Sequence, residues 1–219
     1  MEKKIKAIIF DMDGVLIDSE LYWGEIERDF FESRGVKYTK RINSQVRGRP
    51  EKEMVAWAKR EYGFTETVDE LLAIRDRMTE KIYSVRARPM AGIEDLLKKI
   101  RKKGYKSGIA SSSVLRRIKM IVERLGWQSF FDKLMSSVDE GCDGKPAPDI
   151  YLRATKALTA APENCVVLED TENGVRAAKR AGMRCVAITD KRWQHGDLSR
   201  ADLLIDSLAD KKLFEYLNL

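Results

Sequence analysis

The sequence predicts an α/β fold: a doubly wound parallel sheet with helices on both faces, and a helical cap domain inserted after the first strand. Two observations carry this prediction. From residue 92 onward, short apolar runs alternate with amphipathic stretches of helical periodicity, which is the pattern of successive βαβ units. Between Glu20 and Arg86, the periodicity is helical and no convincing strand occurs.

The first strand is expected at residues 5–10, a β-rich apolar run typical of a strand that is buried on both faces. The later strands are expected at 107–110, 133–136, 165–168, 185–188 and 203–205. Helices are expected between and after them, at 92–103, 114–125, 148–159, 172–181 and 207–217. Gly104, Gly126 and Gly182 follow three of these helices, where glycine commonly caps a helix C-terminus.

The inserted stretch contains three runs of apolar residues at helical spacing, which begin near residues 21, 54 and 68. We expect it to form a small domain over the carboxyl edge of the sheet. The predicted boundaries are 1–18 and 88–219 for the catalytic core and 19–87 for the cap domain, with hinges near 16–19 and 86–91.

Composition favours a cytoplasmic protein with a small-molecule partner. No window approaches the roughly 20 apolar residues of a membrane helix, and the apolar run near the N-terminus is too short for a signal peptide. The net charge of +6 comes from Lys and Arg residues that are spread over predicted outer helix faces. We therefore expect neither a membrane nor a nucleic-acid partner, and a monomer is the default expectation.

Histidine and cysteine content disfavours hydrolase mechanisms that rely on those residues. His195 is the one histidine, and it is interpreted as a surface residue in a polar stretch. The three cysteines lack the spacing of a metal site: Cys165 and Cys185 fall in predicted strands, whereas Cys142 lies in a loop. A mechanism that needs a histidine base is therefore not expected.

Four separated stretches carry side chains that suit phosphoryl transfer, and each follows a predicted strand or lies in a Gly/Pro-rich loop. In an open parallel sheet, ligands bind at the carboxyl ends of the strands, so these stretches are expected to meet there. The candidate residues in them are Asp11, Asp13 and Gly14, then Ser111 and Ser112, then Lys145, and finally Glu169 and Asp170.

The aspartates of the first stretch supply the reacting groups. The Asp11 carboxylate is a competent nucleophile toward phosphorus, and Asp13 can protonate the leaving oxygen and later activate water. Gly14 permits a sharp turn that brings backbone N–H groups toward an anion. Taken alone, the same residues are also consistent with an ordinary Asp-Gly turn.

The other stretches supply charge and hydrogen-bond donors. Glu169 and Asp170 form an acidic pair suited to Mg²⁺, although acidic residues also favour a helix N-terminus. Lys145 and Ser111 can hold phosphate oxygens, but each taken singly is more often a surface lysine or a helix-capping serine. Because phosphoryl transfer depends on positioning and charge neutralisation, the combination is more informative than its members.

Over nearly the whole chain, the sequence resembles the haloacid dehalogenase (HAD) superfamily of phosphohydrolases, and most of all its β-phosphoglucomutase-like subgroup. The resemblance rests on residues 11–19, Ser111, residues 144–151 and residues 169–174. It implies a HAD-like Rossmannoid core with a helical cap. It also implies that Asp11 is the nucleophile, Asp13 the acid/base, and Ser111 and Lys145 the phosphate holders, with Gly14 and Ser112 as substrate contacts and Mg²⁺ held by Asp11, Asp13, Glu169 and Asp170.

Two positions in the insert depart from β-phosphoglucomutases. By the resemblance, those enzymes carry a histidine where this chain has Trp23, and a phosphate-gripping arginine where it has Glu51. A mutase must hold a second phosphate while its intermediate reorients. We therefore expect a phosphatase that hydrolyses a small phosphomonoester, such as a sugar phosphate, through an aspartyl-phosphate; the alternative is a β-phosphoglucomutase-type phosphomutase.

Substrate choice is expected to lie in the cap. Trp23 and Arg49 are the candidate substrate-binding residues, with Tyr22 and Arg47 beside them. The alternative is that Trp23 belongs to the cap core and that Arg49 is an ordinary surface residue. A closing cap suits a small phosphorylated metabolite as the partner and excludes a large phosphoprotein.

Two other classes of protein remain as alternatives. A phospho-signalling receiver domain also uses Asp, Ser/Thr, Lys and an acidic pair, but it has a short chain without an inserted helical block. A catalytically silent scaffold is the second alternative, and the retention of every key side chain argues against it.

Overall fold

The computed structural model describes residues 4–46, 49, 51–139, 141–193 and 196–219. The chain divides into two compact units: a core unit that combines Met1–Glu20 with Ala87–Leu219, and a helical unit, Leu21–Arg86. The inserted helical unit therefore begins after the first strand and ends before the second.

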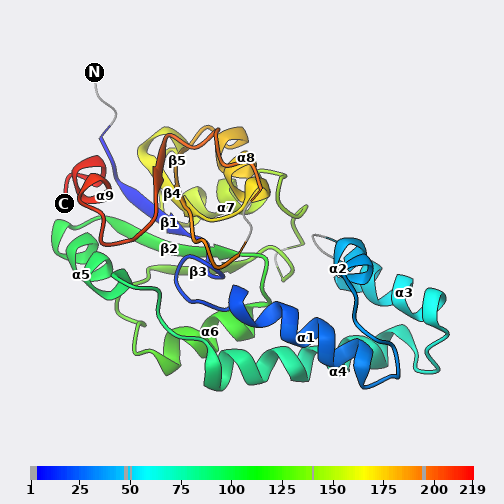
Figure 1. Ribbon diagram of the computed structural model, residues 1–219. Coiled ribbons are helices and arrows are strands. Elements are labelled where there is room, and N and C mark those ends of the chain that lie inside the picture. Colours follow the sequence, from blue (N-terminus) through cyan, green and yellow to red (C-terminus); the bar gives the residue numbers. More distant parts are fainter. Residues whose placement is uncertain (1–3, 47–48, 50, 140, 194–195) are drawn as a thin grey trace. The chain divides into compact units, whose positions relative to one another are not determined.

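The core unit is built on a six-stranded parallel sheet with the order β3-β2-β1-β4-β5-β6 (Figure 1). The described strands are β1 (Ala7–Phe10), β2 (Lys106–Ser111), β3 (Lys133–Ser136), β4 (Cys165–Glu169), β5 (Arg184–Ile188) and β6 (Leu203–Ile205). Strand order reverses at β1, which pairs with β2 on one side and β4 on the other. Ligands bind at such a switch point, outside the carboxyl ends of the strands.

Helices cover both faces of this sheet, as Figure 1 shows, with α7 and α8 on one face and α5, α6 and α9 on the other. Successive residues of β1 therefore face opposite layers: Ala7 and Ile9 join the core cluster of α7 and α8, and Phe10 packs edge-on against Phe131 at 5.8 Å between ring centroids. The described helices are α5 (Ile93–Lys103), α6 (Leu115–Arg124), α7 (Asp149–Ala157), the 3₁₀ turn η2 (Pro162–Asn164), α8 (Glu172–Arg180) and α9 (Lys211–Leu217).

The helical unit has its own apolar core, in which Phe30 and Phe31 are fully buried and meet edge-on at 5.4 Å. Thr67 and Glu70 form a reciprocal capping box that starts the longest helix of the unit. The described helices are α1 (Glu20–Glu32), α2 (Lys40–Val46), α3 (Glu51–Tyr62), α4 (Val68–Lys81) and the π-helix η1 (Ile82–Arg86).

The predicted fold class is confirmed, and most predicted elements lie within one or two residues of the observed ones. The strands at Lys133–Ser136 and Leu203–Ile205 have the predicted bounds. Helix α9 was predicted too long: it begins at Lys211 because the Asp210 side chain accepts a hydrogen bond from the N–H of Lys212 at 2.9 Å and caps the helix there. The short helix α2 was missed, since its buried residues are only Ile42 and Val46.

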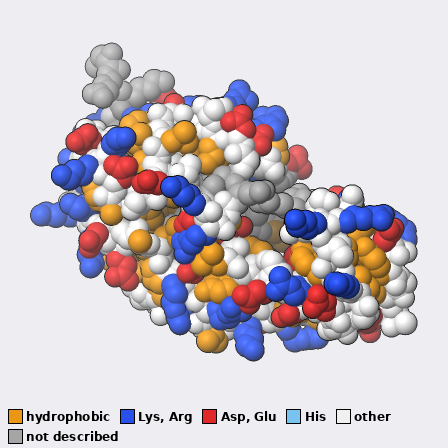
Figure 2. All heavy atoms as spheres, viewed as in Figure 1, with side chains coloured by type: hydrophobic (Ala, Val, Ile, Leu, Met, Phe, Trp, Pro, Cys, Tyr) orange, Lys and Arg blue, Asp and Glu red, His pale blue; other side chains and the backbone are white. Residues whose placement is uncertain are grey.

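Charged side chains are scattered over the visible surface, where Lys and Arg lie among acidic and apolar residues (Figure 2). No helix in the described part of the chain is long and apolar enough to cross a membrane.

Candidate active site

The candidate catalytic residues emerge where adjacent strands end. Asp11 directly follows β1, and its N–H continues the β1–β4 pairing by donating to the Leu168 carbonyl at 3.0 Å. Ser111 is the last residue of β2, and Glu169 is the last residue of β4. Because β2, β1 and β4 are neighbours and parallel, all three side chains emerge at the carboxyl edge of the sheet.

Lys145, in the loop before α7, bridges two of these stretches. Its Nζ donates to Oδ1 of Asp11 at 2.5 Å and to Oε1 of Glu169 at 2.6 Å. The side chains of Lys145, Asp11 and Glu169 are only 7%, 10% and 1% exposed. Lys145, Asp11 and Glu169 therefore form a buried group of one cation and two carboxyl groups. An added cation would balance the second carboxylate charge.

The Glu169 carboxylate is held on both oxygens. Besides Lys145, Oε1 accepts the Tyr151 hydroxyl at 2.8 Å. Oε2 accepts the N–H of Asp170 at 2.9 Å, and both the N–H and the hydroxyl of Thr171 at 3.0 Å. Five hydrogen bonds thus fix Glu169 in a position from which it anchors Lys145.

Burial and the neighbouring charges shift the proton affinities of this group. Burial raises the pKa of Asp11 well above its usual range, against the opposing effect of the Lys145 ammonium. Although burial alone would lower it, the pKa of Lys145 is raised by the carboxylates of Asp11 and Glu169. Burial likewise opposes ionisation of Glu169, but Lys145 and the hydrogen bonds to the carboxylate lower its pKa. Lys145 is therefore a permanent cation, and a further cation would favour the ionised form of Asp11.

Asp13 is oriented by two serine hydroxyls. Ser19 donates to Oδ1 at 2.5 Å, and Ser113 donates to Oδ2 at 2.9 Å. The N–H of Ser113 also donates to Oγ of Ser111 at 3.0 Å. These contacts join the first and second predicted stretches, whereas Ser112 is exposed and stays a predicted substrate contact.

Gly14 lies directly against Asp170. Its φ of +77° is in the left-handed region, and a Cβ at this position would collide with Oδ2 of Asp170. The Gly14 N–H donates to the Ile17 carbonyl at 2.9 Å and closes the turn. Asp170 is 1% exposed, and its Oδ2 also accepts the indole N–H of Trp193 at 3.1 Å. The first and fourth stretches are therefore packed together.

The oxygen donors in this cluster fit Mg²⁺. Within the described ranges, no group of three or more His, Cys, Asp or Glu side chains is placed to hold a metal ion. Mg²⁺ needs fewer protein side chains, since it is commonly bound by one or two carboxylates together with waters and substrate phosphate. Asp11 and Asp170 supply two carboxylates, and Gly14 lets the Asp170 carboxylate approach the first stretch closely, because a Cβ at position 14 would collide with its Oδ2.

Trp23, Arg49 and Glu51 lie on or next to helices α1 and α3 of the helical unit. Trp23 is half-buried on α1. The Arg49 guanidinium lies 5.5 Å from the ring centroid of Trp57. Glu51 accepts the Nε–H of the buried Arg75 at 3.1 Å. Arg47, also a candidate, lies outside the described residues, as does His195.

Several residues that shape the site had no predicted role. One is Ser113, which directly follows the stretch that contains Ser111 and Ser112. Another is Tyr151, which lies two residues after the start of α7. Trp193 belongs to no such stretch, and no sequence signal pointed to it.

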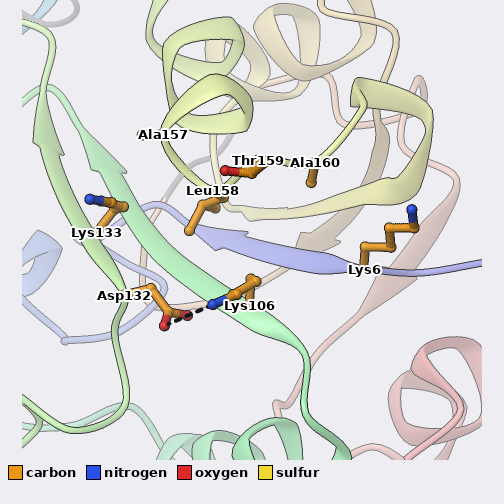
Figure 3. A pocket seen from close by; sticks show the side chains of 8 residues that line it. All are labelled: Lys6, Lys106, Asp132, Lys133, Ala157, Leu158, Thr159 and Ala160. Carbon is orange, nitrogen blue, oxygen red and sulfur yellow. Dashed lines mark ion pairs between the residues drawn. The ribbon is translucent and has the colours of Figure 1, made fainter.

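A separate pocket of about 410 Å³ opens at the amino ends of β1, β2 and β3, as Figure 3 shows. Lys106 forms an ion pair there with Asp132 at 3.8 Å. None of the candidate catalytic residues lines this pocket. Its lining residues are Lys6, Lys106, Asp132, Lys133, Ala157, Leu158, Thr159 and Ala160. This pocket is therefore not part of the candidate site, which lies at the carboxyl edge of the sheet.

Comparisons with known proteins agree with this geometry. Residues 8–188 match the haloacid dehalogenase-like hydrolase family. The chain is 31% identical over 179 residues to the phosphorylated carbohydrates phosphatase of Thermotoga maritima, a match that covers 82% of each protein. The crystal structure of CbbY from Rhodobacter sphaeroides in complex with phosphate superposes with a TM-score of 0.79 at 26% identity, covering 94% of this chain and 96% of that one. A β-phosphoglucomutase from Clostridium difficile gives a TM-score of 0.78 at 25% identity, covering 97% and 96%.

Proposed function

The chain belongs to the haloacid dehalogenase-like hydrolases and is a phosphatase of that family, and we propose that it hydrolyses a small sugar phosphate in a Mg²⁺-dependent reaction through an aspartyl-phosphate on Asp11. The observation that carries the proposal is the contact of Lys145 with both Asp11 and Glu169. It joins the proposed nucleophile to a fixed cation at the edge of the sheet where ligands bind.

In the first step, a carboxylate oxygen of Asp11 attacks phosphorus, and the ester P–O bond breaks. The electron pair of that bond leaves with the substrate oxygen, which takes a proton from Asp13. The hydroxyls of Ser19 and Ser113 aim the Asp13 carboxyl group for this transfer. The products of the step are the free alcohol and the phosphorylated Asp11.

In the second step, Asp13, now ionised, removes a proton from water, and the water oxygen attacks phosphorus. The bond from Asp11 to phosphorus breaks, which restores the carboxylate and releases inorganic phosphate. Asp11 and Glu169 raise the pKa of Lys145, so the ammonium group stays protonated. Its positive charge can therefore offset the negative charge of the phosphate in both steps.

Mg²⁺ is proposed to bind Asp11, Asp170 and the backbone carbonyl of Asp13, where it would supply positive charge that offsets the phosphate and carboxylate charges. Glu169 was also a predicted ligand. Because both of its oxygens accept hydrogen bonds from the protein, we assign it the role of holding Lys145 and the loop that starts at Asp170.

The charges of the helical unit favour a phosphatase over a phosphomutase. Arg75 is 3% exposed and donates to Glu27 at 2.9 and 3.0 Å and to Glu51 at 3.1 Å. Its guanidinium is thus committed to two carboxylates. A carboxylate at position 51, where the mutases carry an arginine, does not attract a second phosphate, so water is the proposed acceptor.

The substrate class rests on the relatives. A phosphatase named for phosphorylated carbohydrates is similar to this chain over most of its length, which favours a sugar phosphate. Trp23 and Arg49 remain the proposed contacts to the part of the substrate that is not phosphate.

A panel of sugar phosphates and p-nitrophenyl phosphate, assayed for phosphate release with Mg²⁺ and with EDTA, tests the proposal. We expect Mg²⁺-dependent release from at least one sugar phosphate. No release from the panel, or release unchanged by EDTA, would contradict it. Efficient conversion of β-glucose 1-phosphate to glucose 6-phosphate, with its bisphosphate present only as activator, would instead establish the phosphomutase.

A further inference from the structure

A tryptophan from a separate loop reaches the end of β4. Trp193 follows β5, and its Nε1–H donates to Oδ2 of Asp170 at 3.1 Å. The indole N–H is a donor only and carries no charge. It can therefore orient a carboxylate without neutralising its negative charge.

The Trp193 loop is itself braced. Arg192 donates through Nε to Oδ1 of Asp190 at 2.9 Å and through Nη2 to Oδ2 at 2.6 Å, while its own N–H also reaches Oδ1 at 2.9 Å. The Arg192 guanidinium lies 5.0 Å from the centroid of the Trp193 ring. At the start of the loop, the N–H of Thr189 donates to the Ile205 carbonyl at 2.8 Å. These contacts restrain the residues that lead to the indole and one face of its ring.

The same Asp170 oxygen is bounded on another side by Gly14, where a Cβ would collide with it. Asp170 is 1% exposed, so the carboxylate has little room to rotate. Contacts from two distant parts of the chain therefore hold one oxygen of this side chain.

We propose that Trp193 is a positioning residue that fixes the Asp170 carboxylate in the orientation in which it binds Mg²⁺. The inference rests on the proposed function, in which Asp170 is a metal ligand. Groups that orient a metal ligand through its other atoms typically contribute 10- to 100-fold to metal affinity, and about 10-fold is expected of one neutral hydrogen bond.

The test is a Mg²⁺ titration of the full-length chain carrying Trp193→Phe, which removes the N–H and keeps an aromatic ring. Trp57→Phe is the matched control, because the described contacts of Trp57, with Phe31, Tyr62 and Arg49, lie within the helical unit. Mg²⁺ affinity is read from isothermal titration calorimetry and from the shift of Tm with Mg²⁺ concentration. The Tm of each variant in EDTA reports on the fold alone.

We expect Trp193→Phe to weaken Mg²⁺ binding by about 10-fold with an unchanged Tm in EDTA, and Trp57→Phe to bind Mg²⁺ like the wild type. Wild-type affinity in Trp193→Phe would overturn the positioning role and leave the phosphatase proposal standing. A Tm in EDTA that falls together with the affinity would show a structural role and also overturn it. If the wild type bound no Mg²⁺, both proposals would fail.

Discussion

The ammonium nitrogen of Lys145 lies 2.5 Å from Oδ1 of Asp11, so the proposed nucleophile is in direct contact with a buried cation. The same ammonium is anchored 2.6 Å away by Glu169, which is held in turn by Tyr151 and Thr171. A chain of hydrogen bonds thus runs from the nucleophile into the layer of α7 and the start of α8. Preorganised charge of this kind is a principal source of rate acceleration in phosphoryl transfer.

Lys145→Met removes the cation and leaves two buried carboxyl groups facing each other. We expect kcat/KM to fall by at least about 100-fold. The free energy of unfolding should also fall, by about 3–5 kcal/mol, because the remaining buried charges are unpaired. Phosphatase assays and urea denaturation measure the two effects.

The matched control for that variant is Lys6→Met, which alters an exposed lysine of the pocket at the amino ends of the strands. It should leave both quantities near the wild-type values. Turnover of Lys145→Met comparable to that of Lys6→Met would refute the assigned role.

Tyr151→Phe deletes one hydrogen bond to the Glu169 carboxylate and keeps the buried ring. Hydrogen bonds to charged groups contribute about 1.5–3 kcal/mol, so the free energy of unfolding should fall by that amount. Tyr105→Phe provides the comparison, since the Tyr105 hydroxyl donates to the neutral carbonyl of Leu217 at 2.9 Å. We expect a loss of about 0.5–1.5 kcal/mol there, and an equal loss in both variants would argue against a charged partner for Tyr151.

The contribution of Tyr151 should depend on pH. Burial and the nearby Glu169 raise the pKa of Tyr151 well above 10, so the folded state keeps the phenol proton more tightly than the unfolded state. Its stabilisation is therefore fully present below the unfolded pKa of about 10 and is lost as pH rises through the folded pKa. The stability difference between the wild type and Tyr151→Phe should narrow above about pH 10, and a constant or widening difference would contradict this.

The three thiols should differ in reactivity. Burial raises the pKa of Cys165 to about 11 and that of Cys185 further, whereas Cys142 is only half-buried in its loop. Because the thiolate is the reactive form, iodoacetamide at about pH 8 should label Cys142 first. Peptide mass spectrometry locates the label, and Cys142→Ser should remove the fast phase. Fast labelling of Cys165 or Cys185 in the native protein would be inconsistent with their burial.

The buried strands and the helices that cover them were largely predictable from the sequence. Continuous apolar runs such as residues 165–168 have few alternatives to a central strand, and glycine at position 104 adopts the left-handed φ of +78° expected of a helix cap. The short helix α2 was not predictable in this way, because two buried residues in seven do not define a period. Its place is set by packing against the Phe31 cluster.

The candidate site was predictable to the extent that its residues follow strands. Asp11 directly follows β1 and Glu169 ends the neighbouring strand β4, so parallel pairing alone brings them to one edge. The contacts of Ser113 with Asp13 and of Trp193 with Asp170 are different, since they join residues that only the folded chain brings together. Periodicity carries no information about such pairs, and neither residue type is diagnostic by itself.

Trapping of the covalent intermediate identifies the residue that carries the phosphoryl group. The enzyme is mixed with its substrate and Mg²⁺, quenched in acid and treated with borohydride, which reduces an aspartyl-phosphate to homoserine. We expect homoserine at position 11 in the peptide mass spectrum, and none in Asp11→Asn. Homoserine at Asp13, or an unmodified Asp11 in an enzyme that is turning over, would contradict it.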